Sequence, residues 1–376
     1  MLHTPLQYGG VILVAFAVAG ISVDALRPMS KFMVIFAVII VIIAATPVLA
    51  MYGVLFEPVS VFSTALLAGI AGVLFSRTES GRRKLLFLQV SRQRACRKVM
   101  TELARRPFGV SLKGESRGVT VLACRIANGS DLCGDLRACE VIELSNYFCS
   151  EAVQFVLGNG GYLDEWGPGG VRFCFGLPIE DESHAATACR VAFELKIHLE
   201  KIRAECEERW QVPVKYGISL VSGDMPAGLI GSGSFTRFSV IGEEAGLAER
   251  MCDLSLNYGP AVFISGDASR SVKEQMEFRL VALLDRGGDK GPTEVNELLN
   301  VVKDCDDDSA MRRDEYSRGF VCFREGDFVS ALEHFKKACP ASGTDKVLAY
   351  YQGLAEENIR RGSDAEDKTM HVDVSI

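Results

Sequence analysis

The segment Gly160–Gly176 constrains the fold of this chain more than any other stretch. It opens on a glycine pair, turns at Gly167–Gly170 and returns through Val171, Phe173 and Phe175. Apolar residues at every second position are typical of a strand with one buried face, and a Gly/Pro cluster between two such runs predicts a tight turn. The sequence therefore predicts a β-hairpin whose return strand packs one face into a core.

Strand-like and helix-like segments surround the hairpin on both sides. A buried strand is predicted at Val119–Cys124, and apolar periodicity predicts further elements at 139–157, 184–204, 214–221, 239–242, 243–252 and 261–265. Helices with one apolar face, mixed with short buried strands, are typical of an α+β domain.

Three apolar runs precede this domain, at about 8–23, 32–51 and 59–75. About 20 apolar residues suffice for a helix to cross a bilayer. The basic residues fall between the first two runs and after the third, so the positive-inside rule places the N-terminus outside and the α+β domain in the cytoplasm. We therefore expect 1–76 to form three transmembrane helices in the inner (cytoplasmic) membrane; a signal peptide is the alternative for the first run.

The segment 77–117 is basic and prone to helix as far as Pro107, and a polar linker follows. It is interpreted either as a juxtamembrane helix that contacts anionic membrane lipid or as a short parallel dimer stalk. The two interpretations are compatible.

Charge and cysteine spacing exclude two classes of function. The net charge of −7 gives no electrostatic support for binding nucleic acid. The 12 cysteines show neither CxxC nor Cys/His ligand spacing, so they indicate reduced thiols that fill the core rather than a zinc site or a disulfide framework.

Several motifs occur in order along 118–300. They include Val119–Leu122, Phe175–Pro178, Tyr216–Ile218, Phe238–Gly242 and Leu247–Met251. In sequence and spacing they resemble the catalytic domain of class III adenylate/guanylate cyclases. The resemblance implies a ferredoxin-like α+β fold for this part of the chain.

The resemblance also implies a chemistry. In that family two Asp residues hold two divalent cations, Mg²⁺ or Mn²⁺, while a ribose hydroxyl attacks the α-phosphate of a nucleoside triphosphate. The metal positions fall on Arg125 and on Gly169, where this chain offers no carboxylate. We therefore expect no cofactor, and Mg²⁺ or Mn²⁺ only if the protein is an active cyclase. Asp131, Asp135 and Asp164 are the candidate substitute ligands.

The nucleotide-binding positions are also substituted. The base-reading pair falls on Glu165 and Arg237, and the ribose-placing Asn falls on Gly246. Only the transition-state Arg is retained, as Arg250. Glu165 is interpreted either as a guanine-selective residue or as half of a charge-swapped salt bridge with Arg237.

The C-terminal part divides into three segments. Residues 301–313 are predicted to be an acidic linker, and 363–376 a disordered tail. Residues 314–362 resemble one tetratricopeptide repeat with an added helix, or else form a generic helical hairpin. Because one repeat cannot bury its own apolar face, we expect it to dock on the α+β domain, on a second copy or on a protein partner.

These observations predict a membrane-anchored signalling protein whose cyclase-like domain is degenerate and acts as a regulator or scaffold. The alternative is an active adenylate or guanylate cyclase, alone with substitute ligands or in a heterodimer. Either interpretation predicts a homodimer, or a heterodimer with another cyclase-like chain.

Overall fold

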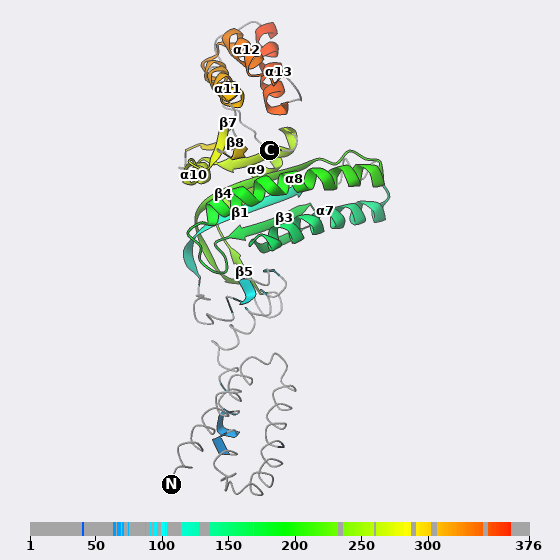
Figure 1. Cartoon of the computed structure of the whole chain (residues 1–376), viewed down its shortest axis with the longest axis vertical. Coiled ribbons are helices and arrows are strands. Elements are labelled where there is room, and N and C mark those ends of the chain that lie inside the picture. The colour runs from blue at the N-terminus through cyan, green and yellow to red at the C-terminus, as the bar shows by residue number, and fades with distance from the viewer. Residues whose placement is uncertain are drawn as a thin grey trace. The chain divides into compact units, whose positions relative to one another are not determined.

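The computed structural model (Figure 1) describes the residues that form the α+β domain and the C-terminal helices. The described ranges are 114–127, 136–167, 169–231, 236–258, 261–286, 291–301, 307–340 and 345–361, with scattered positions between 40 and 103. The chain divides into two compact units, Met1–Gln93 with Gly231–Thr236 and Arg94–Ile230 with Arg237–Ile376. All elements below belong to the second unit.

The expectation of three transmembrane helices is corrected by the structure. None of the helices in the described part of the chain is long and apolar enough to cross a membrane. A crossing helix needs about 20 consecutive apolar residues. The integral-membrane location fails with the spans on which it depended. Most of 1–76, and most of the predicted helix and linker at 77–117, lie outside the described residues.

Six elements build the centre of the second unit. They are β1 (Glu115–Ile126), α7 (Ala138–Gly158), β2 (Tyr162–Gly167), β3 (Gly170–Phe175), α8 (His184–Trp210) and β4 (Tyr216–Ile230). The strands lie in the order β2-β3-β1-β4, and every neighbouring pair is antiparallel. This is the split βαβ arrangement of a ferredoxin-like fold, as the sequence predicted.

The sheet continues beyond β4. The elements that complete the α+β domain are β5 (Arg237–Val240), α9 (Glu243–Tyr258), β6 (Val262–Ser265), α10 (Gly266–Ser271), β7 (Met276–Leu284) and β8 (Thr293–Val301). The full order is β2-β3-β1-β4-β6-β8-β7, with β5 paired to β4 and β6 parallel to β4.

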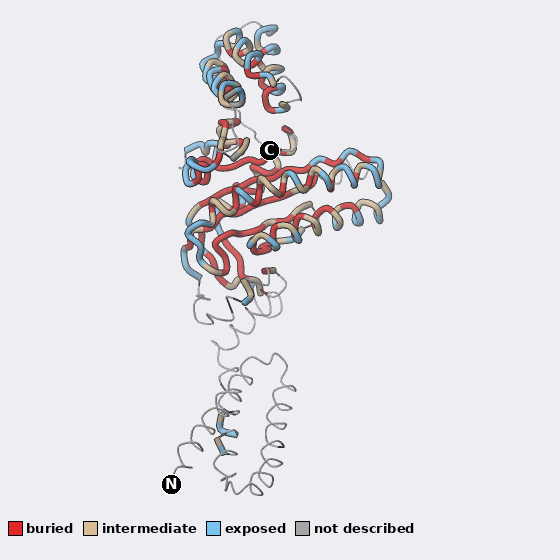
Figure 2. The backbone as a smooth tube through the Cα atoms, in the orientation of Figure 1, coloured by how far each residue is buried: buried red, intermediate tan, exposed pale blue. Residues whose placement is uncertain are grey.

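The two faces of the sheet are covered by different helices. On one face α7 and α8 bury an apolar stripe, because residues such as Leu144, Phe148 and Ala152 recur one helical turn apart (Figure 2). On the other face α9 packs against β1 and β4, where the hydroxyl of Ser219 donates to the carbonyl oxygen of Ala248 at 2.5 Å. Side chains on β1 and β3 that point toward α9 therefore lie on the opposite side of the sheet from the α7–α8 core.

The C-terminal helices are α11 (Asp307–Glu325), α12 (Phe328–Lys337) and α13 (Lys346–Arg361). The turn between α11 and α12 uses Gly326 at φ +83°, and the Asp327 carboxylate accepts from the backbone amide of Ser330 at 3.0 Å, which caps α12. Helix α11 begins inside the acidic run, earlier than the boundary set at 314. Acidic residues in a first turn favour a helix start because they meet the positive end of the helix dipole.

These helices, which we call the helical tail, dock on the α+β domain. Arg279 on β7 bonds to Glu297 on β8 at 2.6 Å and to Asp345, just before α13, at 2.5 Å. The Tyr351 hydroxyl donates to the carbonyl oxygen of Val281 on β7. Of the docking sites that the sequence left open, the structure shows contacts with the chain's own α+β domain.

Candidate functional site

A cleft of about 280 Å³ opens between the β2–β3 hairpin, the end of β1 and helix α9. It brings together three of the positions singled out from the sequence, Arg125, Glu165 and Gly169. Its other lining residues are Ala123, Gly167, Gly170, Val171, Arg172 and Glu249.

Strand register decides which side chains face this cleft. Ala123 pairs with Arg172 and Arg125 pairs with Gly170 across the antiparallel β1–β3 ladder. Directly opposed residues project from the same face of a sheet, and neighbours along a strand project from opposite faces. Arg125 and Arg172 therefore share the α9 face of the sheet. Cys124, the neighbour of Arg125 on β1, projects from the opposite face and packs into the α7–α8 core.

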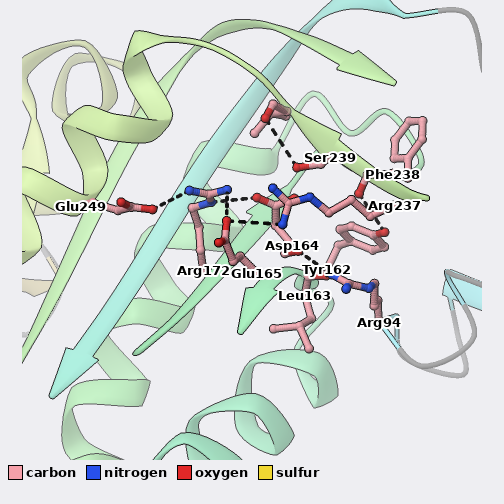
Figure 3. Close-up of polar contacts among 11 residues, drawn as sticks. Arg94, Tyr162, Leu163, Asp164, Glu165, Arg172, Arg237, Phe238, Ser239 and Glu249 are labelled. Carbon is pink, nitrogen blue, oxygen red and sulfur yellow. Dashed lines mark hydrogen bonds and ion pairs between the residues drawn. The ribbon is translucent and has the colours of Figure 1, made fainter. Parts of the chain in front are cut away.

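Arg172 bonds to three carboxylates at once (Figure 3). Its guanidinium lies 2.7 Å from Asp164, 2.7 Å from Glu165 and 2.5 Å from Glu249 on α9. The Asp164 side chain is 0% exposed, whereas those of Glu165 and Glu249 are nearly half exposed. This cluster joins both strands of the hairpin to helix α9.

A β-bulge explains how two successive residues of β2 reach the same guanidinium. The pairing of β2 with β3 shifts register between Leu163 and Glu165, so that Asp164 is the extra residue. In a regular strand Asp164 and Glu165 would point to opposite faces, and a bulge redirects one of them.

The hairpin is also held from its outer edge. The Arg94 guanidinium donates to the backbone oxygen of Asp164 at 2.5 Å (Figure 3). Ala95 forms an isolated bridge with Tyr162. The Tyr162 hydroxyl donates to the backbone oxygen of Phe238 on β5 at 3.0 Å. The chain just before the domain and the strand β5 therefore both fix the position of Asp164.

Arg125 forms the second ion pair of the cleft. Its guanidinium lies 2.8 Å from the carboxylate of Asp253, one helical turn after Glu249 on α9. Burial raises the pKa of the Asp253 carboxyl; the Arg125 charge opposes this rise and Glu249 adds to it. Each arginine of the cleft is thus neutralised by carboxylates of the same chain.

The Glu165 carboxylate lies between two arginines, since Arg237 on β5 approaches it at 3.5 Å. This contact is the charge-swapped pair considered from the sequence. Both side chains are more than one-third exposed to solvent, so the pair contributes no more than about 0–1 kcal/mol to the stability of the fold.

The remaining predicted positions lie around the rim. Gly246 is on α9, and a Cβ built there meets no atom within 4 Å. Arg250, one turn further, donates from its guanidinium to the backbone oxygen of Asp285 at 3.4 Å. The carbonyl oxygen of Gly169 accepts from the amide of Ile126 at 3.1 Å. The next residue, Gly170, approaches β1 so closely that a Cβ would lie 2.5 Å from a carbonyl oxygen.

The residues of this cleft do not fit a pair of divalent cations. No group of three or more His, Cys, Asp or Glu side chains in the described ranges is arranged to hold a metal ion. Asp164, the candidate substitute ligand that the structure describes, is bound to Arg172, and Asp131 and Asp135 lie outside the described residues. Guanidinium groups occupy the neighbourhood of both metal positions of the resembled family.

Sequence reasoning did not identify Arg172, Glu249 or Asp253. The signal was present, because Arg172 is the charged residue in an otherwise apolar return strand, and Glu249 and Asp253 are four residues apart on one helix face. What the sequence lacked was the register that places that helix face over that strand.

Comparisons with known proteins agree with the resemblance found in the sequence. No family model matches the chain. The chain is 20% identical over 164 residues to adenylate cyclase 1 of Rhizobium meliloti (strain 1021), covering 44% of this chain and 25% of that protein. It is 27% identical over 167 residues to an uncharacterized protein of Mycobacterium tuberculosis (strain ATCC 25618 / H37Rv), covering 43% of this chain and 27% of that protein. The chain therefore spans about a quarter of the length of these relatives.

The structural neighbours are class III adenylate/guanylate cyclase domains. The guanylyl cyclase Cya2 aligns with a TM-score of 0.47 and 21% identity, covering 51% of this chain and 96% of that chain. The adenylyl cyclase CyaB from P. aeruginosa aligns with a TM-score of 0.47 and 20% identity, covering 52% of this chain and 100% of that chain.

Proposed function

We propose that this chain is a catalytically degenerate cyclase-like protein of cyclic-nucleotide signalling. It uses the cyclase-like fold to dimerise with, or regulate, another chain rather than to make cyclic nucleotide. The observation that carries the proposal is that the cleft holds two arginines, Arg125 at one metal position of the resembled family and Arg172 beside it, each ion-paired within the chain.

Electrostatics supports this proposal. Opposite charges about 4 Å apart attract by roughly 4 kcal/mol at an effective dielectric constant of 20. A divalent cation entering the cleft would have to displace Arg125 and Arg172 from Asp164, Glu249 and Asp253, the carboxylates that would otherwise bind it. This competition disfavours metal-dependent cyclisation by this chain alone.

A second candidate function is catalysis as one half of a mixed dimer. The observation in its favour is Arg250, which the resemblance places at the transition-state position and whose guanidinium lies 3.4 Å from the backbone oxygen of Asp285. In the resembled family this Arg acts on nucleotide held by the other subunit. A second cyclase-like chain with intact metal ligands would then supply what this one lacks.

The test of the first proposal is a binding and turnover experiment on the full chain. ATP and GTP are titrated by calorimetry with and without Mn²⁺, and the same samples are assayed for cyclic product. We expect no metal-dependent binding and no product. Metal-dependent binding accompanied by product refutes the degenerate interpretation.

The mixed-dimer candidate needs a different assay. The chain is mixed with a class III cyclase that keeps its metal ligands but whose own transition-state Arg has been replaced. Product that appears on mixing and disappears with Arg250→Ala supports the candidate; Arg190→Ala, on the exposed face of α8, is the matched control. Without product on mixing, the candidate is rejected.

A further inference from the structure

A second cleft, of about 540 Å³, lies where the helical tail meets the α+β domain. It shares no lining residue with the arginine-filled cleft described above. Its walls come from α8, the start of β4, the end of α9, strands β7 and β8, and the start of α13. The lining residues are Lys196, Glu200, Arg203, Val214, Lys215, Tyr216, Tyr258, Ala261, Arg279, Glu297, Leu299, Asp345, Lys346 and Val347.

The wall of this cleft is rigidly built. Arg279 has a side chain only 8% exposed, and it bonds to Glu297 on one side and to Asp345 on the other. Tyr216 is buried, and its hydroxyl donates to the Glu200 carboxylate at 2.6 Å. Buried, hydrogen-bonded groups of this kind give a cavity a fixed shape before any ligand arrives.

The charges of the lining are not balanced. Its three carboxylates pair with its two arginines, Glu200 with Arg203 at 3.0 Å and both Glu297 and Asp345 with Arg279; Arg203 also pairs at 2.8 Å with Glu207, which lies outside the lining. Three lysines remain, namely Lys196, Lys215 and Lys346, and within the described ranges no carboxylate is paired with any of them. Five cations against three carboxylates leave an excess of two positive charges, in a chain whose net charge is −7.

Size and lining chemistry narrow the class of ligand. Small-molecule sites have volumes of about 300–1,000 Å³, and this cleft lies within that range. A phosphate monoester carries about −1.5 to −2 charges at neutral pH, which matches the excess of the lining. Lysine binds phosphate as a point charge, and the apolar side chains of Val214, Leu299 and Val347 offer contact to a ring or chain attached to it.

We infer that this cleft binds a small phosphate monoester of nucleotide size, and that the bound ligand links the helical tail to the α+β domain. Lys196 and Lys215 belong to the domain, whereas Lys346 begins α13 of the tail. An anion held by all three lysines bridges the two parts. Its binding free energy therefore adds to the contacts of Arg279 and Tyr351 that already dock the tail.

The experiment uses the full chain and three probes: adenosine 5′-monophosphate, inorganic phosphate and uncharged adenosine. Calorimetry is expected to show saturable binding of the monophosphate, competition by inorganic phosphate and no binding of adenosine. Lys196→Gln and Lys346→Gln are each expected to weaken binding about tenfold, the loss of one charge-assisted contact. Lys201→Gln on α8 and Lys336→Gln on α12, exposed lysines outside the cleft, are the matched controls.

Hydrogen exchange gives an independent readout of the bridging role. Saturating monophosphate is expected to slow exchange in the first turn of α13, at Val347 and Leu348, and Lys346→Gln is expected to abolish that protection. A change in the same amides without ligand would reveal a folding defect of the variant.

Three outcomes overturn the inference. One is the absence of binding by the monophosphate and by phosphate at millimolar concentration. Another is equal weakening by all four lysine variants, which would indicate unspecific attraction. The last is binding that survives Lys196→Gln but is lost with Arg125→Gln, which would place the anion in the first cleft.

Discussion

Replacing Arg172 is expected to destabilise the domain far more than replacing an ordinary surface arginine. In Arg172→Met the side chain stays unbranched and apolar near the backbone, but it is shorter and loses its charge and all its hydrogen-bond donors. The Asp164 carboxylate, which is 0% exposed, then has no cation at 2.7 Å. Removing one partner of a buried ion pair costs about 3–5 kcal/mol, because a buried charge is left uncompensated.

The other two contacts of Arg172 add little to this cost. Glu165 and Glu249 are 45% and 43% exposed, so water solvates them when the arginine is lost. Each such pair is worth about 0–1 kcal/mol. The loss therefore comes mainly from Asp164.

Urea unfolding at pH 7, followed by circular dichroism, measures the effect as a change in the free energy of unfolding. Arg190→Met is the matched control, since Arg190 pairs with Glu194 at 3.1 Å on the exposed face of α8 and both side chains are at least 42% exposed. If Arg172→Met costs no more than this control to within about 1 kcal/mol, the reasoning is wrong.

A double-mutant cycle isolates the buried pair. Asp164→Asn removes the negative charge at constant shape, so Arg172→Met is expected to cost about 1–3 kcal/mol less in that background than in the natural chain. Additive losses would show that Asp164 and Arg172 do not depend on each other.

Three further predictions concern other parts of the molecule. Gly246→Asn is expected to leave the urea midpoint nearly unchanged, because its Cβ meets open space, whereas Gly170→Ala is expected to cost about 1–3 kcal/mol, because its Cβ would lie 2.5 Å from a backbone oxygen. Burial pushes the pKa of the Asp345 carboxyl upward, but the hydrogen bond and charge of Arg279 outweigh burial and hold this pKa below its ordinary value. The stability from Asp345 is therefore full above about pH 4 and lost as pH falls further, so Asp345→Asn should flatten the acid limb of a stability–pH curve; an unchanged limb contradicts this. Burial raises the pKa of the Cys252 thiol to about 12. At pH 8, before urea is added, only exposed thiols should therefore react with Ellman's reagent. Rapid labelling of Cys252 in the native chain would contradict this prediction.

The ferredoxin-like core was predictable because local pattern and long-range motif order agreed. Alternation in Val171, Phe173 and Phe175 fixed the return strand, and the structure buries these residues on one face. The order of strands and helices then left few ways to build an antiparallel sheet. The resemblance supplied the rest by matching Tyr216–Ile218 to a strand of that domain, and the structure forms β4 there and pairs it with β1.

The charge network was beyond the reach of sequence reasoning for a geometric reason. Arg172 and Asp164 are eight residues apart in the sequence, but their contact depends on the β-bulge at Asp164. No residue near Asp164 predicts that bulge. The contacts of Glu249 and Asp253 depend on how α9 lies across β1 and β3. Docking of the tail through Arg279 and Asp345 is likewise a pairing of residues 66 positions apart. The apolar N-terminal runs were wrongly predicted for the opposite reason. Their composition alone predicted membrane spans, but no helix in the described part of the chain is long and apolar enough to be one.

The pairing of β1 with β4 sets the order in which this chain can fold. Strand β1 is the first of the sheet to be synthesised, yet its ladder with β4 runs from Glu115 opposite Ala227 to Ile126 opposite Tyr216. The chain loses the entropy of closing this long loop before the β1–β4 contacts form and stabilise it. Such non-local pairing slows folding. The tail helices contact one another over short sequence separations, and their docking on β7 joins residues 66 and 70 positions apart. A nascent chain can thus pair β1 with β3 on one side, but the other edge of this apolar strand stays unpaired until β4 emerges.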